Sequence, residues 1–400
     1  MNDARPFDVC IVGGGLVGAS LAVALAPLKL RVALVETAAP PQTSASWDER
    51  CLAINDGSRR IFEAMGVWNE LLTAAEPITS THISERGRFG VARFTAAEVG
   101  LAALGYNIPM RHLGQTLWRQ MQSTATTLFC PAQVTALQVD EAAALLTLDT
   151  GASLQAKLVI AADGAHSAVR QLLGIDTETR DYEQSAIITA VRVQRSHDGV
   201  AYERFTPGGP FAILPKPGNA CSLVWTVPSK QVPEMLAWSD AEFIARAQEM
   251  FGERLGRFLE IGRRNAHPLA RVMSGRLSAP RVLFAGNAAQ TLHPVAAQGF
   301  NLGLRDVACV AEVLHEVADP GAPEVLDHYV HSREQDRANV AGFTDRLVRT
   351  FSNRVPGLSG LRHLGLLALD LLPPVKALVM RQNLGRGAGS PQLIREQAES

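Results

Sequence analysis

The chain has 400 residues, of which 47% are hydrophobic and 19% are charged, and its formal net charge is −1. This length allows about two domains, and the composition is typical of a globular protein rather than a disordered one. A net charge close to zero gives no broad attraction for a polyanion, so nucleic-acid binding is not expected. The five cysteines are scattered and form no C-x-x-C pair, which is typical of a reducing compartment.

The chain begins with the order strand, glycine turn, helix, strand. Residues 7–12 form a short apolar run, residues 16–26 are small and helix-compatible, and residues 31–35 form a second apolar run. Two parallel strands joined by a helix make a βαβ unit. Residues 9–28 carry no charge, but the preceding segment lacks the positive charges of a signal peptide, so we expect a cytoplasmic protein.

The turn of this unit carries a dinucleotide-binding fingerprint. Gly13, Gly15 and Gly18 have the G-x-G-x-x-G spacing, and Glu36 ends the second strand. The first glycine permits the tight turn, the second lets the backbone approach a pyrophosphate, and the third lets helix and strand pack closely. Glu36 is placed to accept hydrogen bonds from both ribose hydroxyls and disfavours a 2′-phosphate. The sequence therefore predicts FAD or NAD(H), rather than NADP(H), as the resident dinucleotide.

The middle of the chain alternates between helical and strand patterns. Helices are predicted at 58–76, with a break at Gly66, and at 114–125. Residues 157–175 have the order strand, Asp-Gly turn, helix. The remaining predicted elements are hairpins over 78–108, strands over 133–160 and 183–228 with a turn at Lys216–Asn219, and helices at 240–260, from the glycine-rich segment to about Val317, and at 324–353.

Val282–Leu304 is an unusual segment, because it has no formal charge and yet contains many amide side chains and glycines between Arg281 and Arg305. It is too polar and too interrupted to span a membrane, and too neutral for an ordinary surface loop. The glycine fingerprint, Asp163–Arg170 (DGAHSAVR) and this segment resemble, in that order, the three motifs of the flavin-dependent aromatic hydroxylases. The order and spacing match over nearly the whole chain.

This resemblance implies an α/β fold like that of p-hydroxybenzoate hydroxylase. It implies a Rossmann-like FAD-binding domain, a β-rich substrate domain inserted into it, and a helical C-terminal tail. The expected boundaries are 1–77, 109–180 and 268–340 for the FAD-binding domain, 78–108 and 181–267 for the substrate domain, and 341–400 for the tail.

Several stretches resemble the ubiquinone-biosynthesis branch of that family, most closely the enzymes that hydroxylate 2-polyprenyl-6-methoxyphenol. These stretches are WDERCLAINDGS, ERFTPGGPFAILP, CSLVW, GNAAQTLHPVAAQGFNLGLRD and TDRLVRTFSNR. The resemblance implies an FAD-dependent monooxygenase that uses NADPH or NADH and O₂, through a flavin hydroperoxide, to make the 1,4-benzoquinol. The same chemistry at another ring position, a flavin dehydrogenase or reductase without oxygen insertion, and a non-enzymatic flavoprotein scaffold remain alternatives.

The same resemblance implies roles around the flavin. Asn287, where most of the wider family has Asp, corresponds to the residue that holds the ribityl hydroxyls. Gly299 and Phe300 correspond to the backbone groups facing the pyrimidine edge of the ring. Pro294 corresponds to the proline beside the reactive carbon, and His293 before it is a candidate base for the phenol or a hydrogen-bonding residue of the loop.

Three further residues are implied by position. Arg50 corresponds to an arginine near the flavin, and Gln115 to a polar residue facing the linking chain. Asp163 belongs to the second motif, which contributes to both nucleotides in the family. No metal is expected, because His328 and His331 lie three apart on a helix without an obvious third ligand.

The C-terminal segment from Val355 is rich in leucine but is interrupted by Arg362, Asp370 and Lys376. Its longest apolar run is shorter than the roughly 20 residues that a membrane-spanning helix needs. It could pack on the protein core, on a partner in a ubiquinone-biosynthesis complex, or as a peripheral contact on the inner face of the membrane.

Overall fold

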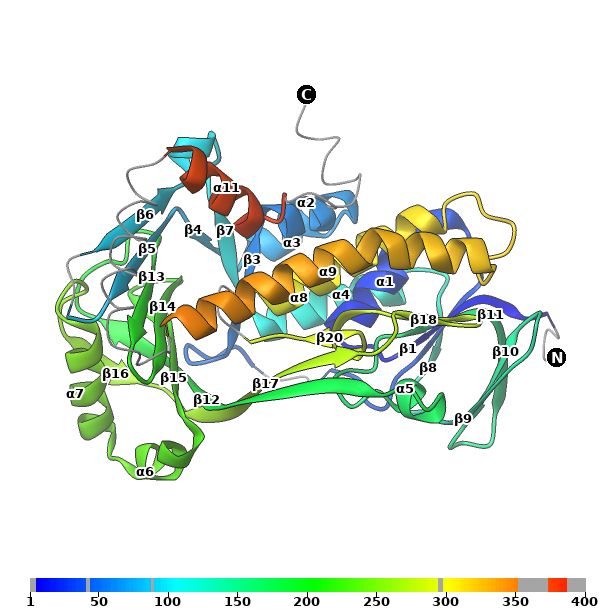
Figure 1. Ribbon diagram of the computed structural model, residues 1–400, viewed down its shortest axis with the longest axis horizontal. Coiled ribbons are helices and arrows are strands. Elements are labelled where there is room, and N and C mark those ends of the chain that lie inside the picture. Colours follow the sequence, from blue (N-terminus) through cyan, green and yellow to red (C-terminus); the bar gives the residue numbers. More distant parts are fainter. Residues whose placement is uncertain (1–4, 41–43, 88–89, 294–297, 352–372, 387–400) are drawn as a thin grey trace.

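The computed structural model describes residues 5–40, 44–87, 90–293, 298–351 and 373–386 (Figure 1). It has the predicted α/β architecture, with two large sheets, one small sheet and helices packed between and around them. The described residues also form four short 3₁₀ helices, η1 (Ala26–Leu28), η2 (Ala97–Val99), η3 (Ser229–Gln231) and η4 (Gly286–Ala288).

The first large sheet, sheet A, contains the N-terminal βαβ unit. Its strand β1 pairs in parallel with β2 and with β11, and α1 connects β1 to β2, as predicted. Strands β8 and β19 extend the parallel part, while β9, β10 and β18 pair antiparallel. The strands of sheet A are β1 (Phe7–Val12), β2 (Val32–Val35), β8 (Thr127–Phe129), β9 (Val134–Val139), β10 (Ala144–Leu148), β11 (Ser153–Ala161), β18 (Ser278–Ala279) and β19 (Val282–Phe284).

Helix α1 (Leu16–Leu25) packs against sheet A and lies between α4 (Met110–Gln122) and α8 (Gln298–Val313). Its small apolar residues let all three neighbours approach, so most of the helix is buried. The predicted break at Gly66 is confirmed, because α2 (Asp56–Ala64) ends before it and α3 (Trp68–Leu72) begins after it. The short α5 (Ala168–Leu172) follows β11, and α9 (Pro323–Phe351) packs on α8.

The second large sheet, sheet C, has the order β20-β17-β12-β15-β14-β13-β5-β6, with β16 beside β12. The predicted turn at Lys216–Asn219 joins β14 to β15. In Figure 1 the long strands β12 and β17 reach from this sheet back beneath α8 and α9. The strands are β5 (Ser80–Glu85), β6 (Val91–Thr95), β12 (Thr177–Val193), β13 (Val200–Thr206), β14 (Gly209–Lys216), β15 (Ala220–Pro228), β16 (Phe258–Ile261), β17 (Asn265–Ser274) and β20 (Gln290–Thr291).

The predicted helix over 240–260 is too long. Helix α7 (Asp240–Phe251) is capped by Ser239 and ends at Gly252, whose φ is 88°. Residues 258–261 form β16 instead, because their backbone pairs with β12. Helices α6 (Val232–Ala237) and α7 cover one face of sheet C with an apolar cluster that includes Phe211 and Trp225.

A third, small sheet has the order β3-β7-β4, and its strands β4 and β7 contact β14 of sheet C. Its strands are β3 (Cys51–Asn55), β4 (Glu76–Ile78) and β7 (Gly105–Pro109). The hairpin prediction for 78–108 is confirmed for β5 and β6, whereas β7 pairs with β3 and β4. Strands β12 and β17 each continue without a break across the expected domain boundaries at residues 180 and 267. The division into domains stays a prediction.

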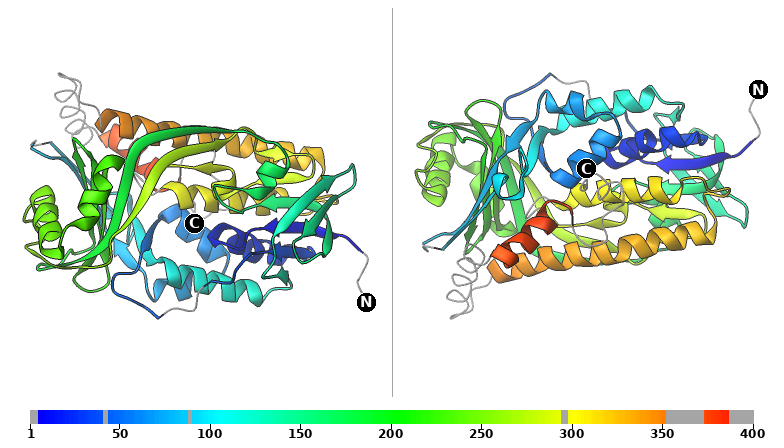
Figure 2. Two further views of the ribbon diagram at one scale, coloured as in Figure 1. Left: turned by 90° about the horizontal axis from the view of Figure 1, so that it is seen from below. Right: turned by 90° about the horizontal axis from the view of Figure 1, so that it is seen from above.

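In the described part of the C-terminal region, α11 (Pro373–Asn383) packs on the rest of the chain (Figure 2). Met380 contributes to a small apolar cluster with Phe94 of β6, and Lys376 pairs with Glu98 at 2.6 Å. Just after the helix, Arg386 pairs with Asp56 at the start of α2. None of the helices in the described residues is long and apolar enough to cross a membrane.

Candidate active site

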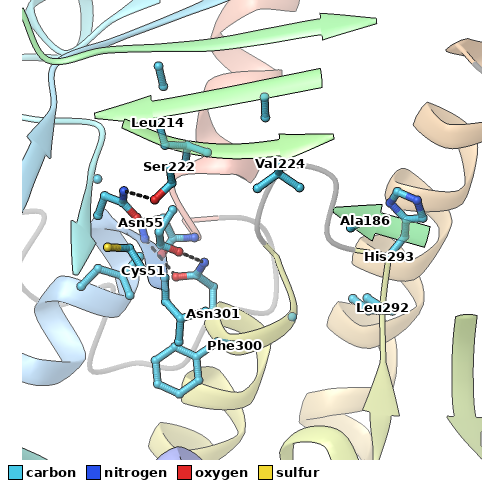
Figure 3. Close-up of a pocket in the computed structure, with 18 of the residues that line it drawn as sticks. Cys51, Asn55, Ala186, Leu214, Ser222, Val224, Leu292, His293, Phe300 and Asn301 are labelled. Atoms are coloured by element: carbon cyan, nitrogen blue, oxygen red, sulfur yellow. Dashed lines mark hydrogen bonds between the residues drawn. The ribbon is translucent and has the colours of Figure 1, made fainter. Parts of the chain in front are cut away.

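A cavity of about 810 Å³ lies where sheet C, β3 and the first turns of α1 and α8 meet. Cavities that bind small molecules commonly have volumes of about 300–1,000 Å³. Figure 3 shows Ser222 and Val224 of β15 on one side of this space and Phe300 and Asn301 at the start of α8 on another. Segments from four distant parts of the sequence therefore form one site.

The glycine fingerprint borders this cavity, and the structural reason for glycine differs among its three positions. A Cβ on Gly13, whose φ is 99°, would lie 2.6 Å from the carbonyl oxygen of Ala162. A Cβ on Gly18 would lie 1.7 Å from the carbonyl oxygen of Gly13. A Cβ on Gly15 would meet nothing within 4 Å, and Gly15 lines the cavity. The protein's own packing therefore requires Gly13 and Gly18, whereas the space at Gly15 is open for a ligand.

Glu36 lies at the end of β2, beside this turn. Its Oε2 accepts a hydrogen bond from the backbone N–H of Gly14. Its Oε1 accepts from the Thr37 hydroxyl at 2.8 Å and from the Ala38 N–H at 3.1 Å. These bonds hold the carboxylate next to the first turn of α1, where unpaired backbone N–H groups favour a phosphate.

The second motif is tied to the third by Arg170. Its buried guanidinium donates at 2.8 Å to the carbonyl oxygen of Ala288, in η4. Ser167 caps α5 by accepting from the Arg170 N–H at 3.1 Å, and Asp163 Oδ2 accepts from the Val169 N–H at 3.2 Å. The other oxygen, Asp163 Oδ1, is buried and accepts no hydrogen bond from any described residue. It is a ready acceptor for a donor on a bound group.

The third motif surrounds the cavity from the other side. Asn287 is exposed toward it from η4, and Gly299 and Phe300 line it from the first turn of α8. Asn301 fixes that turn, because its Oδ1 accepts from the Asn55 N–H at 2.9 Å and its Nδ2 donates to the Ala53 carbonyl at 3.1 Å (Figure 3). The first turn of α8 therefore presents backbone N–H groups to the cavity.

A buried charge network lies behind this motif. Asp306 Oδ2 accepts from the Gly286 N–H at 2.9 Å and from Gln290 Nε2 at 2.8 Å. Its Oδ1 accepts from Arg333 Nε at 2.7 Å, and Asp336 pairs with both Arg333 and Arg305. The roles of Asn301 and Asp306 were not predicted from the sequence, although polar residues at the otherwise apolar, buried positions of α8 indicate a specific partner.

His293 lines the cavity opposite Phe300 (Figure 3). Its ring packs edge-on against Tyr182, with ring centroids 5.2 Å apart. It is 1% exposed, and burial lowers its pKa from 6.5 to about 4. The imidazole is therefore neutral near pH 7, which suits a hydrogen-bonding residue better than a strong base. The expected partner Pro294 lies outside the described residues.

The structure gathers Gly15, Arg50 and Asn287 around one cavity, together with His293, Gly299 and Phe300. Gln115 does not line it, and its side chain accepts a hydrogen bond from Arg111 at 2.9 Å on the surface of α4. The open space at Gly15, the unsatisfied Asp163 Oδ1 and the uncharged third motif fit a bound FAD.

Comparison with known proteins agrees with this geometry. Residues 6–344 match the family model described as an FAD binding domain. The chain is 39% identical to "Ubiquinone hydroxylase UbiL" of Rhodospirillum rubrum, over 97% of this chain and 92% of that protein. It is 33% identical to "3-demethoxyubiquinol 3-hydroxylase" of Escherichia coli, over 95% of this chain and 99% of that protein.

A solved structure of p-nitrophenol 4-monooxygenase PnpA from Pseudomonas putida has the same fold, with a TM-score of 0.78, 19% identity, and coverage of 96% of this chain and 99% of that one. The predicted FAD cofactor and the predicted monooxygenase class are confirmed, and NAD(P)H is the co-substrate typical of the family. The chain belongs to the FAD-dependent monooxygenases, in the family of ubiquinone-biosynthesis flavin hydroxylases.

Proposed function

We propose that this chain hydroxylates a polyprenylated phenol of ubiquinone biosynthesis, 2-polyprenyl-6-methoxyphenol, to the 1,4-benzoquinol. The observation that carries the proposal is the cavity itself, because most residues of its sheet C wall are apolar, namely alanine, leucine, isoleucine, valine, phenylalanine and proline. Such a wall suits a ring that carries a hydrocarbon chain, because apolar surface removed from water stabilises the complex by about 25 cal/mol per Å².

We assign the cofactor residues by their positions. Gly15 leaves room for the pyrophosphate at the start of α1, Gly13 and Gly18 allow the turn that places it there, and Glu36 accepts from the ribose hydroxyls. Asp163 contributes its unsatisfied oxygen at the second motif. When bound, FAD supplies the oxygen activation, with electrons from NADPH or NADH.

The cavity residues bind and orient the ring system. Asn287 supports the ribityl chain, and the N–H groups at Gly299 and Phe300 stabilise negative charge on the pyrimidine edge. Arg50 projects into the same cavity from the residue before β3. We place Pro294 beside the reactive carbon of the flavin. We place Gln115, which does not line the cavity, near the chain that links the two halves of FAD. His293 stays neutral and accepts or donates a hydrogen bond in a site that excludes water.

The second candidate is the same chemistry at another carbon of the ring. The Escherichia coli relative is named for hydroxylation at position 3 of a demethoxyubiquinol. A dehydrogenase or reductase without oxygen insertion is distinguished by oxygen uptake, because a monooxygenase consumes one O₂ for each product formed. Contact with a ubiquinone-biosynthesis complex, and a peripheral position at the inner face of the membrane, belong to the same proposal.

The test is mass spectrometry of quinone-pathway lipids from cells that lack the gene. We expect 2-polyprenyl-6-methoxyphenol to accumulate, and the wild-type gene to relieve it where Gly15→Val does not. Accumulation of an earlier or later intermediate would favour the second candidate. Unchanged ubiquinone would overturn the pathway assignment.

A further inference from the structure

Sheet C turns one face toward the cavity. In β13 the side chains of Ala201, Glu203 and Phe205 alternate onto this face, and all three line the cavity. The rings and head groups of the intervening Tyr202 and Arg204 pack on the other side of β13, where Tyr202 contacts Phe251 and Arg204 donates to the carbonyl oxygen of Phe251, although Tyr202 also borders the cavity. The carboxyl group of Glu203 therefore faces the cavity, and the adjacent Arg204 does not pair with it.

The strand register shows what surrounds this carboxyl. Glu203 is paired with Ala212 of β14 and with Ile83 of β5. Ala212 is paired with Val224 of β15, which is paired with Ile188 of β12. Every other member of this row is apolar, and each one lines the cavity. The small Ala212 leaves room above the carboxyl for a ligand.

Among the described residues that line the cavity, Glu203 is the one carboxylic acid. Its carboxyl group makes no hydrogen bond or ion pair with any described residue, and the half-buried side chain borders the cavity. Burial alone raises its pKa to about 7. An unpaired carboxyl in an apolar wall is unfavourable for folding, so a structural role does not account for it.

We propose that Glu203 is the residue that binds the phenolic hydroxyl of the substrate and accepts its proton. This inference rests on the proposed function. The phenolic O–H bond breaks, the proton passes to the Glu203 carboxylate, and the electron pair stays on the phenolic oxygen. The ring carbons ortho and para to that oxygen become more electron-rich, which favours attack on the activated oxygen. By fixing the phenolic oxygen at β13, Glu203 also determines which ring carbon faces the flavin.

The experiment uses the full-length, FAD-loaded protein, with 2-geranyl-6-methoxyphenol as the probe. Glu203→Gln keeps the shape of the side chain and removes its ability to accept a proton. We expect kcat/KM to fall by about 100-fold, the range of one general base. FAD content and reduction by NADPH without the probe should stay at wild-type values. The matched control is Glu260→Gln on β16 of the same sheet, whose side chain is 53% exposed and pairs with Arg192; it should behave like wild type.

A second variant separates function from folding. Glu203→Leu replaces the lone carboxyl with an apolar side chain, so at about pH 8 its melting temperature should equal or exceed that of wild type while turnover is lost. Wild-type kcat/KM in Glu203→Gln would overturn the proposal, and so would a large loss of melting temperature in both variants. If the wild-type protein instead gives no product and no stoichiometric oxygen uptake with the probe, the proposed function fails, not the role of Glu203 within it.

Discussion

Replacing Gly15 with alanine tests whether the space at the start of α1 exists for a ligand. Gly15 caps α1 with φ −64° and ψ −170°, a conformation that any residue adopts, and its Cβ would meet nothing within 4 Å. Alanine restricts the unfolded chain, which stabilises by about 0.4–1 kcal/mol, but it is a poorer N-cap by a similar amount. We therefore expect the stability of the FAD-free protein to change by less than about 1 kcal/mol.

FAD binding should respond differently. The added methyl group points into the space that we assign to the pyrophosphate, and inserting a methylene-sized group into a close-packed contact costs about 1–3 kcal/mol. The Kd for FAD should rise roughly 5- to 150-fold, since each 1.4 kcal/mol is a factor of ten. Quenching of flavin fluorescence measures the Kd, and thermal unfolding with and without FAD measures the stability.

The matched control is Gly18→Ala, in the same motif. Its Cβ would lie 1.7 Å from the Gly13 carbonyl oxygen, so the turn must move and the FAD-free protein itself should lose more than about 3 kcal/mol. If Gly15→Ala bound FAD as tightly as wild type, the pyrophosphate would not pass this residue. If Gly15→Ala unfolded like Gly18→Ala, the distinction between a ligand space and a packing contact would be wrong.

Three further outcomes follow from the site. Asp306→Asn weakens a buried network of two arginines and two aspartates, so urea unfolding should show that the free energy of unfolding falls by about 3–5 kcal/mol. The exposed control Glu260→Gln should lose less than about 1 kcal/mol, and equal losses in the two variants would refute the role of burial. Ala212→Leu fills the cavity beside Glu203, so KM for the probe phenol should rise several-fold at unchanged FAD affinity, and an unchanged KM would place the ring elsewhere. Because the pKa of His293 is lowered to about 4, the buried ring resists protonation, and wild-type stability should fall as the pH drops from 6.5 toward 4 by up to about 3 kcal/mol. His293→Gln should remove that fall, and the same pH dependence in both proteins would contradict the assignment.

The sequence predicts the parts of this fold that local patterns determine. The βαβ unit, the break at Gly66 and the turn at Lys216–Asn219 all follow from apolar periodicity and turn residues, and each is present. The end of α7 at Gly252 was missed because the apolar pattern continues into β16, whose pairing with β12 overrides helical propensity.

The functional residues divide in the same way. The glycine fingerprint and the neutral third motif are each a continuous stretch of sequence, so their chemistry can be predicted from the sequence alone. The position of Glu203 is different, because its isolation depends on the register of β13 against β14, the next strand in the chain, and against β5, which lies more than 100 residues earlier. A glutamate between a tyrosine and an arginine resembles an ordinary surface strand until that register assigns its face.

The charged residues next to the uncharged segment 282–304 bind partners that lie away from the cavity. The two arginines that enclose it are both paired away from the ligand, Arg281 with Asp319 at 2.7 Å and Arg305 with Asp336 at 3.1 Å. Asp306, one residue further, anchors the loop by accepting from Gly286 and Gln290 on its buried side. The loop can then turn amide side chains and backbone N–H groups toward a flavin without adding a formal charge beside it. Among the described residues that line the cavity, the arginine and carboxylate side chains are Arg50, just before β3, and Glu203, on the sheet C wall. In our proposal Glu203 meets the substrate rather than the cofactor.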